Sequence, residues 1–164
     1  MAVKHFKEKN IPSVYFGGIT VDEVKRRGLP VNEENERKVR EEIRAKEGKV
    51  AYAERIIKQI GELFKEGNEK VVVDGLYSWT EYKAFRDHFS DDVTFIAVTA
   101  PRKLRHERLA MRAERPLTEA EADSRDYAEI ENLEKGGPIA NADYTLVNDG
   151  SKDQLVAKLR EISV

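Results

Sequence analysis

The chain of 164 residues suits one domain with its own hydrophobic core. Its 29 Lys and Arg residues against 31 Asp and Glu leave a net charge of −2, which does not indicate a nucleic-acid partner. Because there is no cysteine, the composition excludes disulfides, thiolate zinc sites and a cysteine nucleophile. No apolar run reaches the roughly 18 residues of a membrane span and no secretory segment is visible, which predicts a cytoplasmic protein with no membrane contact.

Short apolar runs alternate with long amphipathic stretches along the chain. Continuous runs of Val, Ile and Phe are typical of parallel strands that are covered on both faces. In chain order the expected elements are helix 2–9, strand 13–16, helices 20–27, 32–47 and 49–66, strand 71–74, helix 78–89, strand 93–99, helices 101–114 and 118–134, strand 144–147 and helix 151–162. This alternation predicts a three-layer α/β domain, with a parallel sheet of about four strands flanked by helices.

Local signals mark the ends of these helices. The Ser/Thr-x-x-Glu/Gln spacing of a capping box occurs at four expected helix starts, namely Thr20/Glu23, Ser78/Glu81, Thr118/Glu121 and Ser151/Gln154. Glycines that suit helix C-termini follow three periodic segments, at Gly28, Gly48 and Gly67. A turn at Gly136-Gly137-Pro138 is expected to separate helix 118–134 from the last strand.

Asp74 ends the apolar run that begins at Val71, and Gly75 follows it. Ligands of open α/β sheets collect at the carboxyl ends of strands, where a carboxylate can hold Mg²⁺ directly or through water. The alternative is that Asp74 only helps to cap the helix near Ser78. The residues alone leave both interpretations open.

Five arginines recur at spacings of three, three, four and three, which places them on one stripe of a helix: Arg102, Arg105, Arg108, Arg112 and Arg115. Guanidinium groups suit phosphate oxygens, whereas the alternative is a solvated face paired with nearby glutamates. The pairing alternative is favoured for Arg102 and Arg105, and the phosphate interpretation for Arg112 and Arg115. Arg125 then completes an Arg-rich helix–turn–helix of the kind that closes over phosphates as a lid.

Two turns contain glycine and follow expected strands. The turn Asn148-Asp149-Gly150-Ser151 suits the fold by itself, because Asn and Gly accept turn conformations and Ser caps a helix. Its functional interpretation is a loop that presents amides to a purine edge. The turn at Gly17-Gly18 can accept an anion on backbone N–H groups, but it lacks the lysine and the spacing of a Walker A loop. It suits an acceptor substrate better than a triphosphate.

The order of these segments resembles dephospho-CoA kinases and the related nucleotide kinases of the P-loop class. The segments that carry the resemblance are Val71–Gly75, Ser78–Phe89, Val93–Thr99, Arg102–Arg125 and Ala142–Ser151. The last of them, Ala-Asp-x-x-Leu-x-Asn-x-Gly-Ser, is the most specific. The resemblance implies ATP-dependent phosphoryl transfer, with Mg²⁺ and ATP, to a small nucleotide or CoA-precursor substrate.

The resemblance also implies roles for individual residues. It makes residues 20–66 the acceptor-side helices and residues 102–134 an Arg-rich lid, within one domain over residues 1–164. The implied catalytic residues are Asp74, Arg112, Arg115 and Arg125, with Asp74 also at the metal. The implied binding residues are Asn148 and Gly150 for the nucleotide, and Gly17, Gly18 and Arg26 for the acceptor.

The chain departs from that family most clearly in its phosphate-binding loop. No Gly-x-x-x-x-Gly-Lys-Ser/Thr occurs in these residues, and residues 2–9 resemble the remainder of the helix that follows such a loop. The first, central strand of the family sheet is therefore expected to be missing. Smaller departures are Gly18, Val21 and Tyr77, where relatives often have Asp, Arg and Arg.

Two hypotheses follow from these departures. The first is a kinase that is truncated or impaired, because the Walker A loop that holds the β- and γ-phosphates is absent. The alternative is a non-catalytic nucleotide-binding or scaffold protein of the same fold. A missing central strand would leave unpaired backbone groups, so we expect either that the four remaining strands close up or that a partner in a homo-oligomer donates a strand.

Overall fold

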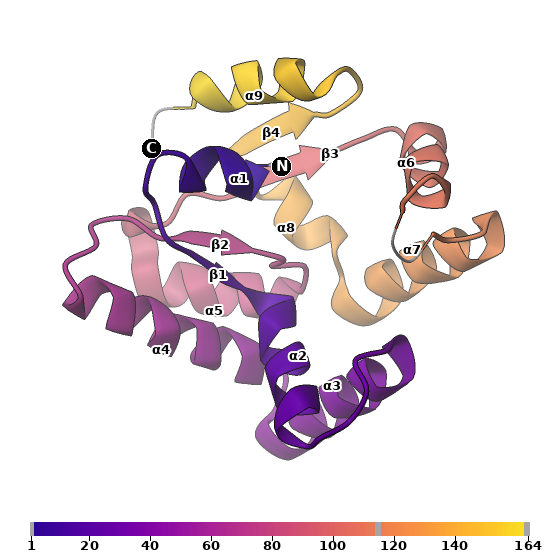
Figure 1. Cartoon of the computed structure of the whole chain (residues 1–164). Coiled ribbons are helices and arrows are strands. Elements are labelled where there is room, and N and C mark those ends of the chain that lie inside the picture. The colour runs from indigo at the N-terminus through magenta and orange to yellow at the C-terminus, as the bar shows by residue number, and fades with distance from the viewer. Residues whose placement is uncertain (1, 114–115, 163–164) are drawn as a thin grey trace. The chain divides into compact units, whose positions relative to one another are not determined.

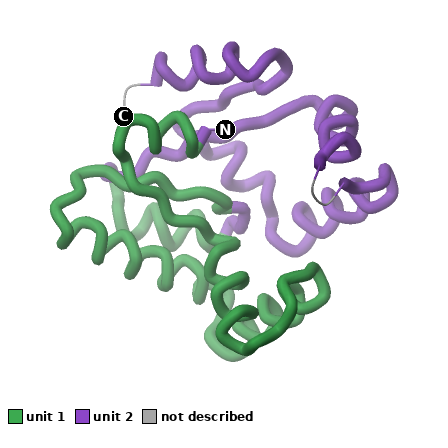
Figure 2. The backbone as a smooth tube through the Cα atoms, in the orientation of Figure 1, with its two compact units in different colours: residues 1, 3–76, 80–90 green, residues 2, 77–79, 91–164 purple. Residues whose placement is uncertain are grey.

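The computed structural model describes residues 2–113 and 116–162, and it divides into two compact units (Figures 1 and 2). Unit 1 contains Val3–Leu76 and Thr80–Ser90, and unit 2 contains Ala2, Tyr77–Trp79 and the described residues from Asp91 onward. The single domain that the sequence favours stays a prediction. Each unit is described by itself below.

Unit 1 contains one parallel strand pair and most of the long helices. Its elements are α1 (Ala2–Lys7), β1 (Ser13–Tyr15), α2 (Phe16–Arg26), α3 (Glu33–Glu47), α4 (Ala51–Lys65), β2 (Val72–Asp74) and α5 (Trp79–Phe89), which the short 3-10 helix Ser90–Asp92 follows. Strands β1 and β2 pair in parallel, with Ser13 opposite Val72 and Tyr15 opposite Asp74. Helix α4 packs against β1 and α2, and α3 packs against α2.

The core of unit 1 follows from the periodicity of α4. Tyr52, Ala53, Ile56 and Ile60 recur at helical spacing, and all four are buried. Ala53 and Ile56 have no exposed surface at all. The ring of Phe16 at the start of α2 lies 5.8 Å from the ring of Phe85 on α5, so aromatic packing extends this core to a third helix.

The expected start of α2 at Thr20 is wrong. The helix begins at Phe16, directly after β1, and Thr20 lies inside it. The Thr20 side chain is buried, with Oγ1 2.8 Å from the Tyr52 hydroxyl on α4, and Glu23 binds arginines instead of the backbone. Thr20 therefore serves packing between helices rather than capping. The predicted glycines after α2, α3 and α4 are in the left-handed region, with φ of 67° at Gly28, 95° at Gly48 and 91° at Gly67.

Unit 2 contains the second parallel strand pair. Its elements are β3 (Ile96–Thr99), α6 (Arg102–Ala110), α7 (Glu119–Leu133), α8 (Gly136–Ala140), β4 (Tyr144–Val147) and α9 (Lys152–Arg160). Strand β3 pairs with β4, with Ile96 opposite Tyr144. The capping boxes predicted at Thr118 and Ser151 are confirmed. Each of these side chains accepts a hydrogen bond from the backbone N–H of the residue three positions later, and the side chain of that residue accepts one from the backbone N–H of Thr118 or Ser151.

The α/β class with parallel strands flanked by helices is confirmed, while two details differ from the sequence expectation. The four strands pair two by two, β1 with β2 and β3 with β4, so the described residues do not form the single ladder of about four strands. A five-residue helix, α8, replaces the turn expected at Gly136. Donation of a strand by a partner stays a prediction. Within 2–113 and 116–162, no helix combines the length and the apolar content that crossing a bilayer requires.

Candidate functional site

The loop after β4 is held by two cationic side chains of unit 2. The Asn148 backbone N–H donates to the Thr99 carbonyl at 2.7 Å and so extends the strand pair. Arg108 on α6 donates to the Asn148 carbonyl at 2.7 Å and to the Gly150 carbonyl at 2.9 Å. Lys158 on α9 donates to the Val147 carbonyl at 2.6 Å. The backbone of this loop is therefore fixed by groups from both neighbouring helices.

Two residues of this loop were predicted to bind the nucleotide. Asn148 is half-buried, and its carboxamide has no hydrogen-bond partner in the part of the chain that the structure describes, so it can still donate and accept. A Cβ at Gly150 would lie 2.0 Å from Gln154 Oε1, which accepts from the Ser151 N–H at 2.7 Å. The absence of a side chain at Gly150 thus has a structural reason, because it leaves room for the capping box of α9.

The first two arginines of the stripe tie α6 to α7. Arg102 forms an ion pair with Asp123, and Arg105 forms one with Asp126. This agrees with the pairing interpretation for both arginines, although the partners are aspartates of α7 rather than nearby glutamates. The guanidinium of Arg105, aided by His106, holds the pKa of Asp126 at about 2 against the opposing effect of its burial.

His106, Asp123 and Asp126 form a group of potential metal ligands within the described ranges. Their ligand atoms lie within 4.8 Å of one another, and His106 Nε2 is 2.9 Å from Asp126 Oδ2. Both carboxylates already have an arginine partner, so a cation would have to compete with two guanidinium groups for them. We therefore assign this group to the attachment of α6 to α7 rather than to a metal site.

The three predicted lid arginines have different surroundings. Arg112 follows α6 and is exposed, and its guanidinium forms no ion pair with any other described residue. Arg115 lies outside the described residues. Arg125 on α7 donates from Nε to Glu129 at 3.1 Å. The sequence interpretation assigned no role to Arg108, which contacts the loop after β4. The one feature of the sequence that could have indicated this role is the position of Arg108 on the same arginine stripe.

A second group of predicted residues lies at the carboxyl ends of β1 and β2 in unit 1. Asp74 ends β2 opposite Tyr15, is exposed, and has no ion pair among the residues described. Gly75 follows with a φ of 87°, which a residue with a side chain rarely adopts. Gly17 and Gly18 form the first turn of α2 beside this edge. The carboxylate of Asp74 has the hard oxygen atoms that Mg²⁺ prefers, so it fits the predicted metal role as a single ligand.

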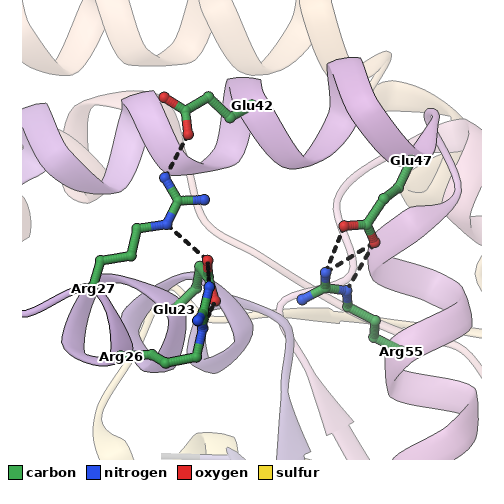
Figure 3. Close-up of polar contacts among 6 residues, drawn as sticks. All are labelled: Glu23, Arg26, Arg27, Glu42, Glu47 and Arg55. Atoms are coloured by element: carbon green, nitrogen blue, oxygen red, sulfur yellow. Dashed lines mark hydrogen bonds and ion pairs between the residues drawn. The ribbon is translucent and has the colours of Figure 1, made fainter.

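The structure separates Arg26 from the other predicted acceptor residues. Arg26 lies in the last turn of α2, nine residues and therefore about 13 Å along the helix axis from Gly17. Its guanidinium donates twice to Glu23, at 2.7 Å each, as Figure 3 shows. Glu23 also accepts from Arg27, which reaches Glu42 on α3 at 2.5 Å. The Arg26 and Arg27 side chains lower the pKa of Glu23 to about 2.

The parallel strands, the flanking helices and the polar residues at the strand ends define a P-loop NTPase-like protein of the kinase type. Residues 3–132 match the family described as AAA domain. The chain is 36% identical over 163 residues to a UPF0200 protein of Thermococcus kodakarensis, a match that covers 98% of this chain and 87% of the relative. It is 33% identical over 163 residues to a UPF0200 protein of Thermococcus onnurineus, with 98% and 87% covered.

A UPF0200/UPF0201 protein of Archaeoglobus fulgidus is 38% identical over 166 residues, which cover 95% of this chain and 48% of that longer protein. The chain therefore belongs to the UPF0200 family of P-loop kinase-like proteins. The names of these relatives state no activity, and none refers to dephospho-CoA. Membership of this family supports nucleotide binding in general and does not specify a reaction.

Proposed function

We propose that the chain binds an adenine nucleotide at the loop after β4 and serves phosphoryl transfer to a small nucleotide or CoA-precursor acceptor. The observation that carries the proposal is the Asn148 carboxamide, which is half-buried, has no partner among the described side chains and backbone groups, and sits on a fixed backbone. A carboxamide offers an acceptor oxygen and an N–H donor side by side, which match the amino donor and the ring-nitrogen acceptor of an adenine edge. Because Arg108 already orders the loop, little conformational freedom remains to be lost on binding.

The phosphate end of the site rests on fewer groups. Exposed Arg112 is the lid arginine that we assign to the phosphates, and Arg115 and Arg125 are proposed to assist it. Independently of this loop, Asp74 at the end of β2 in unit 1 would hold Mg²⁺, which would neutralise charge on phosphate oxygens. These 164 residues contain no Gly-x-x-x-x-Gly-Lys-Ser/Thr, so the chain by itself lacks the loop that cradles the β- and γ-phosphates. We therefore expect nucleotide binding to be stronger than catalysis.

The direct test is thermal unfolding of this chain in ATP, with and without Mg²⁺. A ligand that binds only the folded state stabilises it by about 2.7 kcal/mol at a hundredfold excess over Kd. We expect ATP to raise the melting temperature of the wild type and of Asn132→Ala, an exposed asparagine on α7 that serves as the matched control. The rise should be lost in Asn148→Ala. An equal shift in both variants, or no shift at millimolar ATP, would contradict the proposal.

The alternative is a protein that binds the nucleotide without transferring phosphate, and the missing Walker A loop favours it. The two are separated by following transfer from γ-labelled ATP to nucleoside monophosphates and to dephospho-CoA. Transfer that depends on Mg²⁺ and is lost in Asp74→Asn would establish a kinase and exclude the alternative. Binding of ATP without transfer to any of these acceptors would support it.

A further inference from the structure

Tyr15 is an exposed aromatic residue between two buried ones. It ends β1, and 55% of it is exposed, whereas the neighbouring Val14 and Phe16 are exposed by 8% and 5%. Its hydroxyl has no hydrogen-bond partner within the described part of the chain. Exposing a ring of this size stabilises the fold little, because the hydrophobic gain depends on apolar area removed from water.

The Tyr15 ring packs against three glycines near the carboxyl ends of β1 and β2, namely Gly17, Gly18 and Gly75. A Cβ at Gly17 would be 2.4 Å from the Tyr15 Cζ and hydroxyl oxygen, and a Cβ at Gly75 would be 3.1 Å from Cε2. A Cβ at Gly18 would be 3.7 Å from Cδ1, which is ordinary contact. Gly17 and Gly75 therefore provide the space in which the ring lies, and any side chain at Gly17 would displace it.

A carboxylate accompanies this ring. Asp74 is the residue opposite Tyr15 in the register of β1 and β2, and it is exposed. Residues paired across two strands project from the same face of the sheet, so the ring and the carboxylate belong to one surface. A stacking surface beside a hydrogen-bond acceptor suits a flat heteroaromatic ring that carries N–H donors.

We infer that Tyr15 determines the specificity of the acceptor subsite by stacking on the planar ring of a nucleotide-like acceptor. Asp74 would accept a hydrogen bond from a hydroxyl of the acceptor through the carboxylate oxygen that Mg²⁺ leaves free. The inference rests on the proposed function and makes its acceptor site more specific. The Tyr15 ring would favour acceptors with a heteroaromatic base over sugar phosphates without one. Tyr15 is a binding residue in this account and takes no part in the chemistry.

The probes are AMP, CMP, GMP and UMP, each alone, with ribose 5-phosphate as the ligand without a base. Binding is followed by NMR from the backbone amides of Gly17, Gly18 and Gly75, because a base stacked on Tyr15 shifts these resonances. We expect at least one of the four nucleotides to bind here at least tenfold more tightly than ribose 5-phosphate, as stacking of one base implies. Equal binding of ribose 5-phosphate and all four nucleotides would overturn the inference.

Variants distinguish an effect of the Tyr15 ring on nucleotide binding from an effect on folding. Tyr15→Leu should weaken the preferred nucleotide about tenfold, while Tyr15→Phe and the control Tyr127→Leu, an exposed tyrosine of α7, should stay within about twofold. Gly17→Ala should weaken binding as Tyr15→Leu does, because its Cβ displaces the ring, and Gly18→Ala should not. Unchanged affinity in Tyr15→Leu would overturn the inference even if Gly17→Ala failed to fold.

This test fails independently of the nucleotide site. If ATP stabilises the chain through Asn148 and the glycine amides show no Tyr15-dependent binding, the inference is wrong and the proposed donor site stands. If the amides report Tyr15-dependent binding in the absence of any ATP effect, the stacking surface is real and the proposed donor site is wrong.

Discussion

Unit 1 and the α6–α7 pair of unit 2 are stabilised internally by different kinds of interaction. Unit 1 has a dense apolar core, in which Val24, Val39, Ala53 and Ile56 have no exposed surface. In unit 2, the buried residues among the described parts of α6 and α7 are one histidine and one alanine, His106 and Ala122. The contact between these two helices depends instead on two arginine–aspartate pairs and the His106–Asp126 hydrogen bond.

The difference has a consequence for motion. Burial of apolar surface contributes about 25 cal/mol per Å², whereas partly exposed ion pairs contribute about 0–1 kcal/mol each. Segments with few buried apolar contacts open at lower free energy than the core. We therefore expect α6 and α7 to open locally while unit 1 stays folded, which is the behaviour that a lid over a nucleotide requires.

The largest expected effect is on the core of unit 1. Ile56→Ala removes a fully buried side chain and should lower the free energy of unfolding by about 2–5 kcal/mol, because the cavity adds to the lost burial. The control is Ile130→Ala on α7, where 58% of the residue is exposed and the change should stay within about 0.5 kcal/mol. Urea denaturation measures both. Equal losses would show that α4 does not depend on apolar burial more than α7 does.

A smaller and more local effect is expected from the attachment of α6 to α7. Asp126→Asn removes the charge that Arg105 and His106 face, and should cost about 1 kcal/mol. Hydrogen exchange should become faster in α6 and α7 and remain unchanged in α4. Glu131→Gln, at an exposed position of the same helix, serves as the control. Faster exchange in α4 as well would mean that α6 and α7 open only together with unit 1.

The smallest effect is a pH dependence of unit 1. The pKa of Glu23 is about 2 in the folded chain, below its ordinary value, because of Arg26 and Arg27. A lowered folded-state pKa stabilises the protein above the unfolded value near 4.5, and this contribution is lost as pH falls toward 2. The pairs lie at the surface, so less than about 1 kcal/mol is expected.

Glu23→Gln tests this contribution through urea midpoints measured between pH 7 and pH 2. The variant should be less stable than the wild type at pH 7, and the difference should shrink steadily toward pH 2, where the folded wild-type carboxyl is about half protonated. A constant difference over the whole range would show that the ion pairs in Figure 3 contribute nothing to stability.

The sequence by itself determined the local features of this protein. The strand positions followed from short apolar runs, and the capping boxes at Thr118 and Ser151 depend only on residues three positions away. The polar residues at the ends of β2 and β4 were likewise found from the strands before them. These features were predictable because neighbours in the chain are neighbours in space whatever the rest of the molecule does.

Only the tertiary structure decided which of several identical local patterns was used. Thr20 and Glu23 have the same spacing as the confirmed capping boxes, yet Thr20 contacts Tyr52, which is 32 residues away. Arg102 forms an ion pair with Asp123, 21 residues away, and the surroundings of Tyr15 depend on Gly75, which follows the second strand. A guanidinium or a ring can satisfy its polar and apolar surfaces in many ways, and packing between distant segments selects among them.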